Sequence, residues 1–225
     1  RFVLPGTPVK LLGAGRTDAR VSARGFALQL LITGPPLESE AEFLLEMNRN
    51  LPQDIRLLSI RKVPLDFNVI RDCTRKVYHY YFTFGEKPHP FCAPILGYIP
   101  GPLDLERMKG GAALFVGDHD FRAFTGSPGR DTRTKRRVTE CHLQENNDLT
   151  ASFFPGETFC FTVGGLGFGR YQVRRMMGAV VALGRGVLTE KDLTESLGTG
   201  GPIRVKEIAP ASGLQLSEVY FSIDS

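Results

Sequence analysis

The sequence predicts an α+β fold built around a mainly antiparallel sheet, and three observations support this class. Runs of β-branched and aromatic residues, such as residues 77–84, are typical of strands. Other segments carry apolar residues at helical spacing, as Phe43, Met47 and Leu51 do. The two kinds of segment mix without the regular β-α-β rhythm of a parallel sheet, so antiparallel pairing is expected.

The first part of the chain is expected to hold two strands and one helix. Residues 25–32 form a predicted strand, which a Gly-Pro-Pro segment ends. Ser39 is followed three residues later by Glu42, a capping-box pattern, so a helix should begin there and end before Pro52. Residues 55–63 are predicted to form the second strand. A point near Asp66 is where the chain could divide into two lobes.

The rest of the chain is predicted to alternate long strands with helices and one long loop. Asp104 is a candidate cap for a helix that runs to about residue 116. Residues 171–183 carry an apolar helical face, and a shorter helix contains Asp192 and Leu193. Residues 84–102 are rich in proline and glycine and are predicted to form a loop. Strands are predicted at residues 77–84, 137–143, 158–163 and 214–221.

Composition excludes several classes of protein. The 225 residues are 42% hydrophobic and 23% charged, which excludes a wholly disordered chain. No apolar run approaches the ~20 residues that a membrane helix needs, so no membrane partner is expected. The cysteines, at positions 73, 92, 141 and 160, form no C-x-x-C pair and are expected to be buried free thiols. The net charge of +4 allows a polyanionic partner without requiring one.

Two segments suggest a cofactor or metal site but lack the necessary spacing. Asp118, His119 and Asp120 are adjacent, and adjacent residues on a turn rarely face one ion, so no metal is expected. Residues 164–169 are rich in glycine, but Arg170 stands where a dinucleotide-binding loop would need its last glycine. We therefore interpret residues 164–169 as a flexible turn between a strand and a helix.

Basic residues are dense enough to neutralise nucleic-acid phosphates, although a solvated surface is the alternative. Aromatic residues at positions 78, 80 and 81 could stack on an exposed base, although such a strand is more often part of a core. The first basic group comprises Arg122, Arg130, Arg133, Lys135, Arg136 and Arg137, and the second comprises Arg170, Arg174, Arg175 and Arg185.

Six segments, in order along the chain, resemble the motifs of the TruA-type tRNA pseudouridine synthases. Residues 13–23 are similar to the family signature G-R-T-D-x-G-V-H/S-A. Each motif is weak by itself, and the six in order make the resemblance specific over nearly the whole chain. The other five segments are residues 48–55 (N-x-x-L-P-x-D-I), 66–80 (D-F-x-A-R followed by K/R-x-Y-x-Y), 117–124 (G-x-H-D-F-x-x-F), 168–178 (F-x-x-x-x-V-R-x-I/M-V/M-G) and 210–216 (P-x-x-G-L-x-L).

The chain departs from the family pattern in three places. Arg20 replaces the glycine of the signature, so it either alters the turn or adds a phosphate contact. Val69 and Ile70 replace the A-R of the second motif, which puts the role of that arginine in doubt. The family's opening strand and its Y-x-G-x-x-F/Y-x-G-W-Q segment are absent. Since the chain also opens on Arg1 rather than methionine, we expect it to begin inside a longer protein.

The resemblance implies an enzyme that isomerises uridine to pseudouridine in tRNA without a cofactor. Asp18 matches the essential aspartate, Tyr78 the tyrosine that stacks on the target base, and Arg174 the arginine that pairs with the aspartate. A paired, partly buried Arg174 also fits its place beside an apolar helical line, because an unpaired buried arginine is costly. The residues expected to contact the RNA are Arg16, Arg20, Lys76, Arg130, Arg133, Lys135, Arg136 and Arg170.

The resemblance also implies an architecture and a setting. The pseudouridine synthase fold has two similar α/β lobes around a continuous sheet with a central catalytic cleft. We expect residues 1–66 to form the lobe that carries the aspartate, and residues 67–225 the lobe that carries Tyr78 and Arg174. A homodimer, an anticodon stem-loop substrate and a cytoplasmic location are expected, with a mitochondrial location left open. The alternative is a non-catalytic RNA-binding or ribosome-assembly protein on the same fold.

Overall fold

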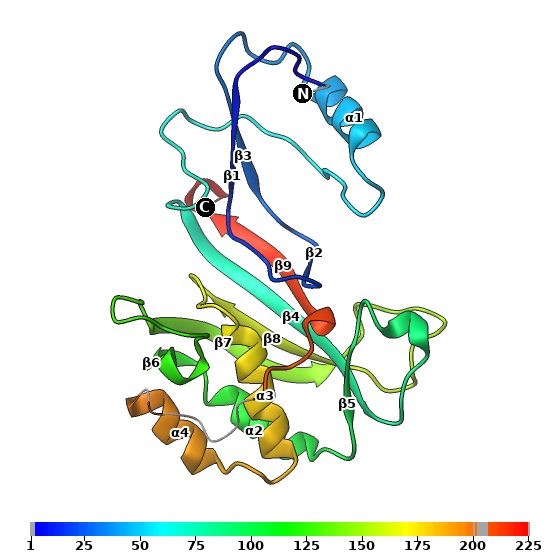
Figure 1. Ribbon diagram of the computed structural model, residues 1–225, viewed down its shortest axis with the longest axis vertical. Coiled ribbons are helices and arrows are strands. Elements are labelled where there is room, and N and C mark those ends of the chain that lie inside the picture. The colour runs from blue at the N-terminus through cyan, green and yellow to red at the C-terminus, as the bar shows by residue number, and fades with distance from the viewer. Residues whose placement is uncertain (1–2, 200, 202–206, 225) are drawn as a thin grey trace. The chain divides into compact units, whose positions relative to one another are not determined.

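The computed structural model describes residues 3–199, 201 and 207–224 (Figure 1). The chain divides into two compact units. The smaller unit comprises Arg1–Gly15 and Ala27–Asp72, and the larger comprises Arg16–Phe26 and Cys73–Ser225. The segment Arg16–Phe26, which contains Asp18, therefore belongs to the same unit as Tyr78 and Arg174.

A 7-stranded, mainly antiparallel sheet forms the centre of the larger unit, in the order β2-β9-β4-β8-β7-β6 with β5 beside β4. Only the β2–β9 and β4–β5 pairs are parallel, which confirms the α+β class. The long strand β4 pairs with β8 along one edge and with β9 and then β5 along the other. The strands are β2 (Ser22–Ala23), β4 (Cys73–Gly85), β5 (Gly97–Pro100), β6 (Gly117–Asp120), β7 (Lys135–Glu145), β8 (Phe159–Gly165) and β9 (Leu214–Phe221).

Three helices gather on one side of this sheet: α2 (Leu105–Ala113), α3 (Gln172–Gly184) and α4 (Glu190–Thr199) (Figure 1). Alternate β4 side chains, including Tyr80 and Phe82, enter the core that these helices cover, together with Met176 of α3. Each large side chain buried in this way stabilises the fold by roughly 1.5–3 kcal/mol. The apolar residues of α3 occupy most of its circumference, so the helix can be buried on nearly every side.

Most of the elements predicted for this part of the chain are confirmed, and β9 has the predicted bounds. Asp104 caps α2 as predicted, because its carboxylate accepts a hydrogen bond from the Arg107 N–H at 3.1 Å. The helix ends at Ala113, earlier than predicted. Phe115 and Val116 donate to carbonyls three residues back, which tightens the last turn.

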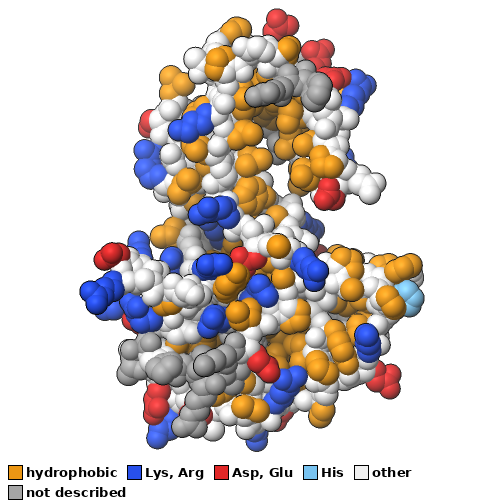
Figure 2. All heavy atoms as spheres, in the orientation of Figure 1, with side chains coloured by type: hydrophobic (Ala, Val, Ile, Leu, Met, Phe, Trp, Pro, Cys, Tyr) orange, Lys and Arg blue, Asp and Glu red, His pale blue; other side chains and the backbone are white. Residues whose placement is uncertain are grey.

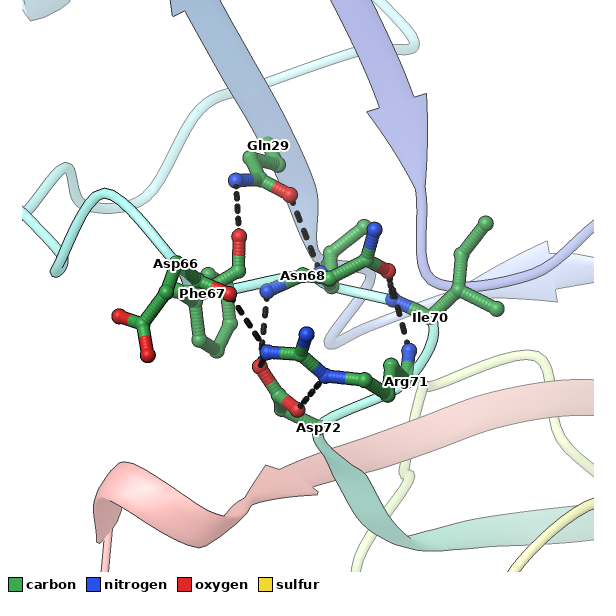
Figure 3. Close-up of polar contacts among 8 residues, drawn as sticks. Gln29, Asp66, Phe67, Asn68, Ile70, Arg71 and Asp72 are labelled. Atoms are coloured by element: carbon green, nitrogen blue, oxygen red, sulfur yellow. Dashed lines mark hydrogen bonds and ion pairs between the residues drawn. The ribbon is translucent and has the colours of Figure 1, made fainter.

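The smaller unit contains a two-stranded antiparallel sheet of β1 (Val9–Gly13) and β3 (Leu28–Ile32), followed by α1 (Glu40–Asn50). The predicted helix start at Ser39 is confirmed, because the Ser39 hydroxyl accepts a hydrogen bond from Glu42 N–H at 3.2 Å. The buried amide of Gln29 fastens β3 to a later turn of the same unit. Its nitrogen donates to the Phe67 carbonyl at 2.7 Å, and its oxygen accepts from Val69 N–H at 3.1 Å (Figure 3).

The prediction of a strand at residues 55–63 is wrong. Instead of pairing with a strand, the backbone N–H and C=O of Leu57 bond the side chain of Asn48, at 2.8 and 3.0 Å. Ile55 and Leu58 are exposed, so the apolar residues of this segment do not line a buried face. A side-chain amide thus supplies the hydrogen bonds that a neighbouring strand would otherwise provide.

The prediction that residues 84–102 are loop throughout is also wrong, because they contain β5 and a short 3-10 helix, Pro90–Cys92. The strand passes so close to Tyr80 that a Cβ on Gly97 would collide with the Tyr80 ring. Glycine at this position therefore permits parallel pairing with the end of β4, a contact between residues distant enough that local composition does not reveal it.

Gly178 of α3 is expected to tolerate no side chain, because a Cβ there would collide with the carbonyl oxygen of Glu207. Gly178→Ala should lower the free energy of unfolding by about 1–3 kcal/mol, the usual range for overpacking. Gly198 of α4 is the matched control, since a Cβ there meets nothing within 4 Å. Gly198→Ala should stabilise by about 0.5 kcal/mol through helix propensity. Urea unfolding of both variants tests this, and equal effects would contradict the close approach.

Candidate active site

The segment that carries Asp18 is fixed to the edge of the larger unit's sheet. Its strand β2 runs parallel to β9, with Ser22 opposite Gln215, and the Arg24 N–H donates to the Leu216 carbonyl at 2.9 Å. The Arg24 guanidinium also pairs with Asp148 at 2.8 Å. These contacts hold the chain a few residues beyond Asp18 and so limit where its carboxylate can lie.

A four-residue turn begins at Asp18 and closes when the Val21 N–H donates to the Asp18 carbonyl at 3.1 Å. Its third residue, Arg20, has a φ of 68°. A type II turn requires a positive φ at this position and favours glycine there. The turn therefore forms with arginine in place of the signature glycine, at a cost of roughly 1–2 kcal/mol.

Arg174 of α3 pairs with Asp18, as the sequence predicted. Its Nη1 lies 3.5 Å from Asp18 Oδ2, and the two side chains are 16% and 33% exposed. The guanidinium is held from a second direction, because its Nε donates to the Ala209 carbonyl at 2.8 Å. The Ala209 N–H in turn donates to the Arg174 carbonyl at 3.1 Å. Hydrogen bonds to the backbone of Ala209 thus hold Arg174 in place, in addition to the charge of Asp18.

Tyr78 of β4 lies on the core side of the sheet, and Phe168 packs edge-on against its ring with centroids 5.2 Å apart. Burial, followed by the negative charge of Asp18, raises the pKa of the Tyr78 hydroxyl to about 12. The phenol is therefore protonated at neutral pH. It can donate a hydrogen bond or stack on a planar ring, but it is not a base in the resting site.

Tyr171 lies beside the ion pair, and the sequence analysis did not identify it. It precedes α3 in the left-handed conformation, with a φ of 60°. The guanidinium carbons of Arg170 and Arg174 lie 4.8 and 5.6 Å from the centre of its ring. The only signal in the sequence is that Tyr171 follows Arg170 directly and precedes Arg174 by three residues, a spacing too common to indicate such stacking.

The residues predicted to contact RNA occupy different environments. Lys76 and Arg136 are half-buried, whereas the others are exposed. Basic side chains gather around the loop before β7 (Figure 2). The exposed residues are Arg16, Arg20, Arg130, Arg133, Lys135 and Arg170.

Residues 66–72, where the chain lacks the family's A-R dipeptide, form a turn in the smaller unit with several internal hydrogen bonds (Figure 3). Ile70 is 61% exposed. The next residue, Arg71, pairs with Asp72 at 2.6 Å and donates to the Asp66 carbonyl at 2.5 Å. Arg71 thus stabilises its own turn.

The two segments considered for metal or nucleotide binding have structural roles. Asp118 lies 4.0 Å from Arg137, and Asp120 caps the 3-10 helix Phe121–Phe124. Among the residues that the structure describes, no group of three or more His, Cys, Asp or Glu is arranged to hold a metal ion. Gly164 and Gly165 of the glycine-rich segment belong to β8, and residues 166–169, which include Phe168, form the predicted connection to α3. All four cysteines are free and buried, which confirms that prediction.

Comparison with known proteins identifies related sequences over nearly the whole chain. Residues 112–222 match the family described as tRNA pseudouridine synthase. The chain is 32% identical over 219 residues to tRNA pseudouridine synthase A of Oenococcus oeni, covering 96% of this chain and 82% of that protein. It is 33% identical over 223 residues to the protein of the same name from Limosilactobacillus fermentum, covering 96% and 81%. For that of Solibacter usitatus the identity is 34% over 219 residues, covering 96% and 85%.

The resemblance predicted from the six motifs is confirmed by these matches. The chain is an isomerase by class, and it belongs to the tRNA pseudouridine synthase family. In the described part of the chain, no helix has the length and apolar character needed to cross a membrane.

Arg20→Gly is expected to be more stable than Arg20→Ala by about 1 kcal/mol. Both substitutions remove the arginine side chain, but only glycine relieves the positive φ of 68°. Urea unfolding of the two variants measures the difference. Equal free energies of unfolding would show that the turn after Asp18 stores no strain.

Tyr78→Phe is expected to remove one ionisation near pH 12 from the ultraviolet absorbance titration of the folded protein. The folded state keeps the Tyr78 proton between pH 10 and about 12, whereas the unfolded state releases it. The resulting stabilisation is present below pH 10 and is lost as the pH rises to about 12. It amounts to a few kcal/mol at most, since one pKa unit corresponds to roughly 1.4 kcal/mol. Identical titrations of wild type and variant would contradict the assigned environment.

Proposed function

We propose that this chain isomerises uridine to pseudouridine in tRNA, with Asp18, Arg174 and Tyr78 as the residues that act on the target nucleotide. The observation that carries the proposal is the half-buried pair of Asp18 and Arg174 beside the protonated Tyr78, all within one compact unit. Membership of the family and the tRNA in the names of the relatives support the choice of reaction and substrate.

The reaction breaks the N1–C1′ bond of uridine and forms a C5–C1′ bond, while C5 loses a proton and N1 gains one. Atoms and charge balance, so the chemistry requires no oxidant or imported group. Asp18 is the nucleophile or base that acts while the uracil is detached and turned. Arg174 compensates the charge of this carboxylate, and the guanidinium is itself held by the Ala209 carbonyl. Neither role needs a residue outside the larger unit.

Tyr78 holds the detached uracil by stacking, and its neutral hydroxyl donates a hydrogen bond. Phe168 supports the ring edge-on, which restricts its rotation. With its pKa raised to about 12, the hydroxyl is protonated in the resting site at neutral pH. In this proposal it assists the proton transfer at C5.

The basic residues bind the phosphates of the tRNA, so affinity should fall steeply with salt. Six of these residues are exposed and so accessible to a polyanion. In this proposal Arg16, two residues before Asp18, contacts the target nucleotide once it leaves its stack. The two-lobed architecture with its divide near residue 66, the homodimer, the anticodon stem-loop substrate and the cytoplasmic location stay predictions.

Asp18→Asn is expected to abolish the release of tritium from tRNA labelled at uracil C5, since pseudouridine formation must expel that hydrogen. The amide cannot act as nucleophile or base, so the rate should fall at least a thousandfold, on the order of 4 kcal/mol of transition-state stabilisation. Asp118→Asn is the matched control, because Asp118 is an exposed aspartate on β6. It should retain the wild-type rate.

The binding of tRNA should be measured on the same samples. Salt-sensitive binding without tritium release by the wild type, on a mixed pool of tRNA, would contradict the proposal and favour the non-catalytic RNA-binding alternative. Release that persists in Asp18→Asn would leave the reaction in place but contradict the role of this residue.

A further inference from the structure

Arg136 differs from the other basic residues around β7 because it is half-buried without a charge partner. Its Nε is buried and has no hydrogen-bond acceptor. Burial lowers the pKa of its guanidinium, and the positive charge of Arg133 lowers it further. No carboxylate among the described residues forms an ion pair with it. The site thus places two cations together and leaves the buried one uncompensated.

An uncompensated, partly buried cation is unfavourable for the fold, because water is removed and nothing replaces it. The neighbouring residue of β7, Arg137, shows the ordinary arrangement. Its side chain is 72% exposed and lies 4.0 Å from the carboxylate of Asp118. Arg75 of β4 also has a buried Nε without an acceptor, but its guanidinium pairs with Glu140. Arg175 of α3 is like Arg136 in having a buried Nε without an acceptor. Among the described residues, Arg136 therefore lacks the anion that Arg75 and Arg137 have.

The position of Arg136 connects it to the candidate active site. A Cβ built on Gly167 would lie 3.7 Å from Arg136 Nη1, so the guanidinium rests against the backbone of that glycine. The next residue is Phe168, whose ring packs against Tyr78. The loop between β8 and α3 thus lies beside both the unpaired guanidinium and the tyrosine proposed to stack on the uracil.

We propose that Arg136, with Arg133, binds a phosphodiester of the RNA at or next to the target nucleotide, and that this anion completes the charge balance of the loop between β8 and α3. The inference rests on the proposed function and deepens it, because it assigns a specific phosphate-binding role to one of many basic residues. The planar guanidinium, with its fork of N–H donors, suits bidentate binding of a phosphate.

The test compares Arg136→Met with Arg107→Met, measuring the melting temperature and the binding of tRNA over a range of salt concentrations. Arg107 is a matched control: an arginine of α2, 64% exposed and paired with Asp104 at 3.2 Å. Arg136→Met should weaken tRNA binding about tenfold and reduce the slope of log affinity against log salt by about 0.7–0.9, the value for one phosphate. Its melting temperature should equal or exceed that of the wild type, because an unpaired charge is removed. Arg107→Met should bind as the wild type does.

Tritium release separates this inference from the proposed function. At saturating tRNA, Arg136→Met should retain most of the wild-type kcat and show a raised KM, because it removes a binding contact. A variant that binds tRNA with wild-type affinity and salt slope would overturn the inference, while release by the wild type would leave the proposed function standing. A lower melting temperature with unchanged binding would also overturn it, since that result indicates a structural role. Arg136→Lys, which keeps the charge, should recover part of the affinity, and failure to recover any would count against a phosphate contact.

Discussion

The ion pair between Arg174 and Asp18 is the interaction on which the candidate site depends. A charge pair with side chains 16% and 33% exposed is favourable only if its geometry is maintained, because desolvation opposes it. Reciprocal hydrogen bonds between Arg174 and Ala209 maintain that geometry. They require the segment around Glu207 to approach α3 closely, which the absence of a side chain at Gly178 permits. Packing of one helix thus determines where a carboxylate on a distant segment can act.

Strand β4 connects this pair to the rest of the larger unit. Its core side places Tyr78 next to the fully buried Tyr80, whose hydroxyl donates to the Pro210 carbonyl at 2.9 Å. Its opposite side carries polar side chains: His79 contacts the Tyr81 hydroxyl, which donates to Asp148, the partner of Arg24. Both sides of the strand therefore reach segments that adjoin the site, one through residues 209–210 and the other through the end of the segment that carries Asp18.

Backbone strain and unpaired charge both occur in segments that adjoin the site. Arg20 and Tyr171 both adopt positive φ, one beside Asp18 and one at the start of the helix that carries Arg174. Arg136 adds a half-buried cation without a partner. Each feature lowers stability, and all three lie within a few residues of groups that would contact a nucleotide. Such unfavourable features persist where the surrounding structure enforces them, and they are typical of sites that bind a ligand.

Local patterns in the sequence were sufficient for the α+β class, most strands and helices, the caps at Ser39 and Asp104, and the pairing of Asp18 with Arg174, which the family motifs implied. Hydrophobic period and capping chemistry are local, so they can be recognised in sequence. Only the tertiary structure decided that residues 55–63 bond Asn48 instead of forming a strand, and that Gly97 admits β5 beside β4. It alone distinguished Arg136 from its exposed neighbours, because burial and charge pairing depend on contacts between residues far apart in the chain.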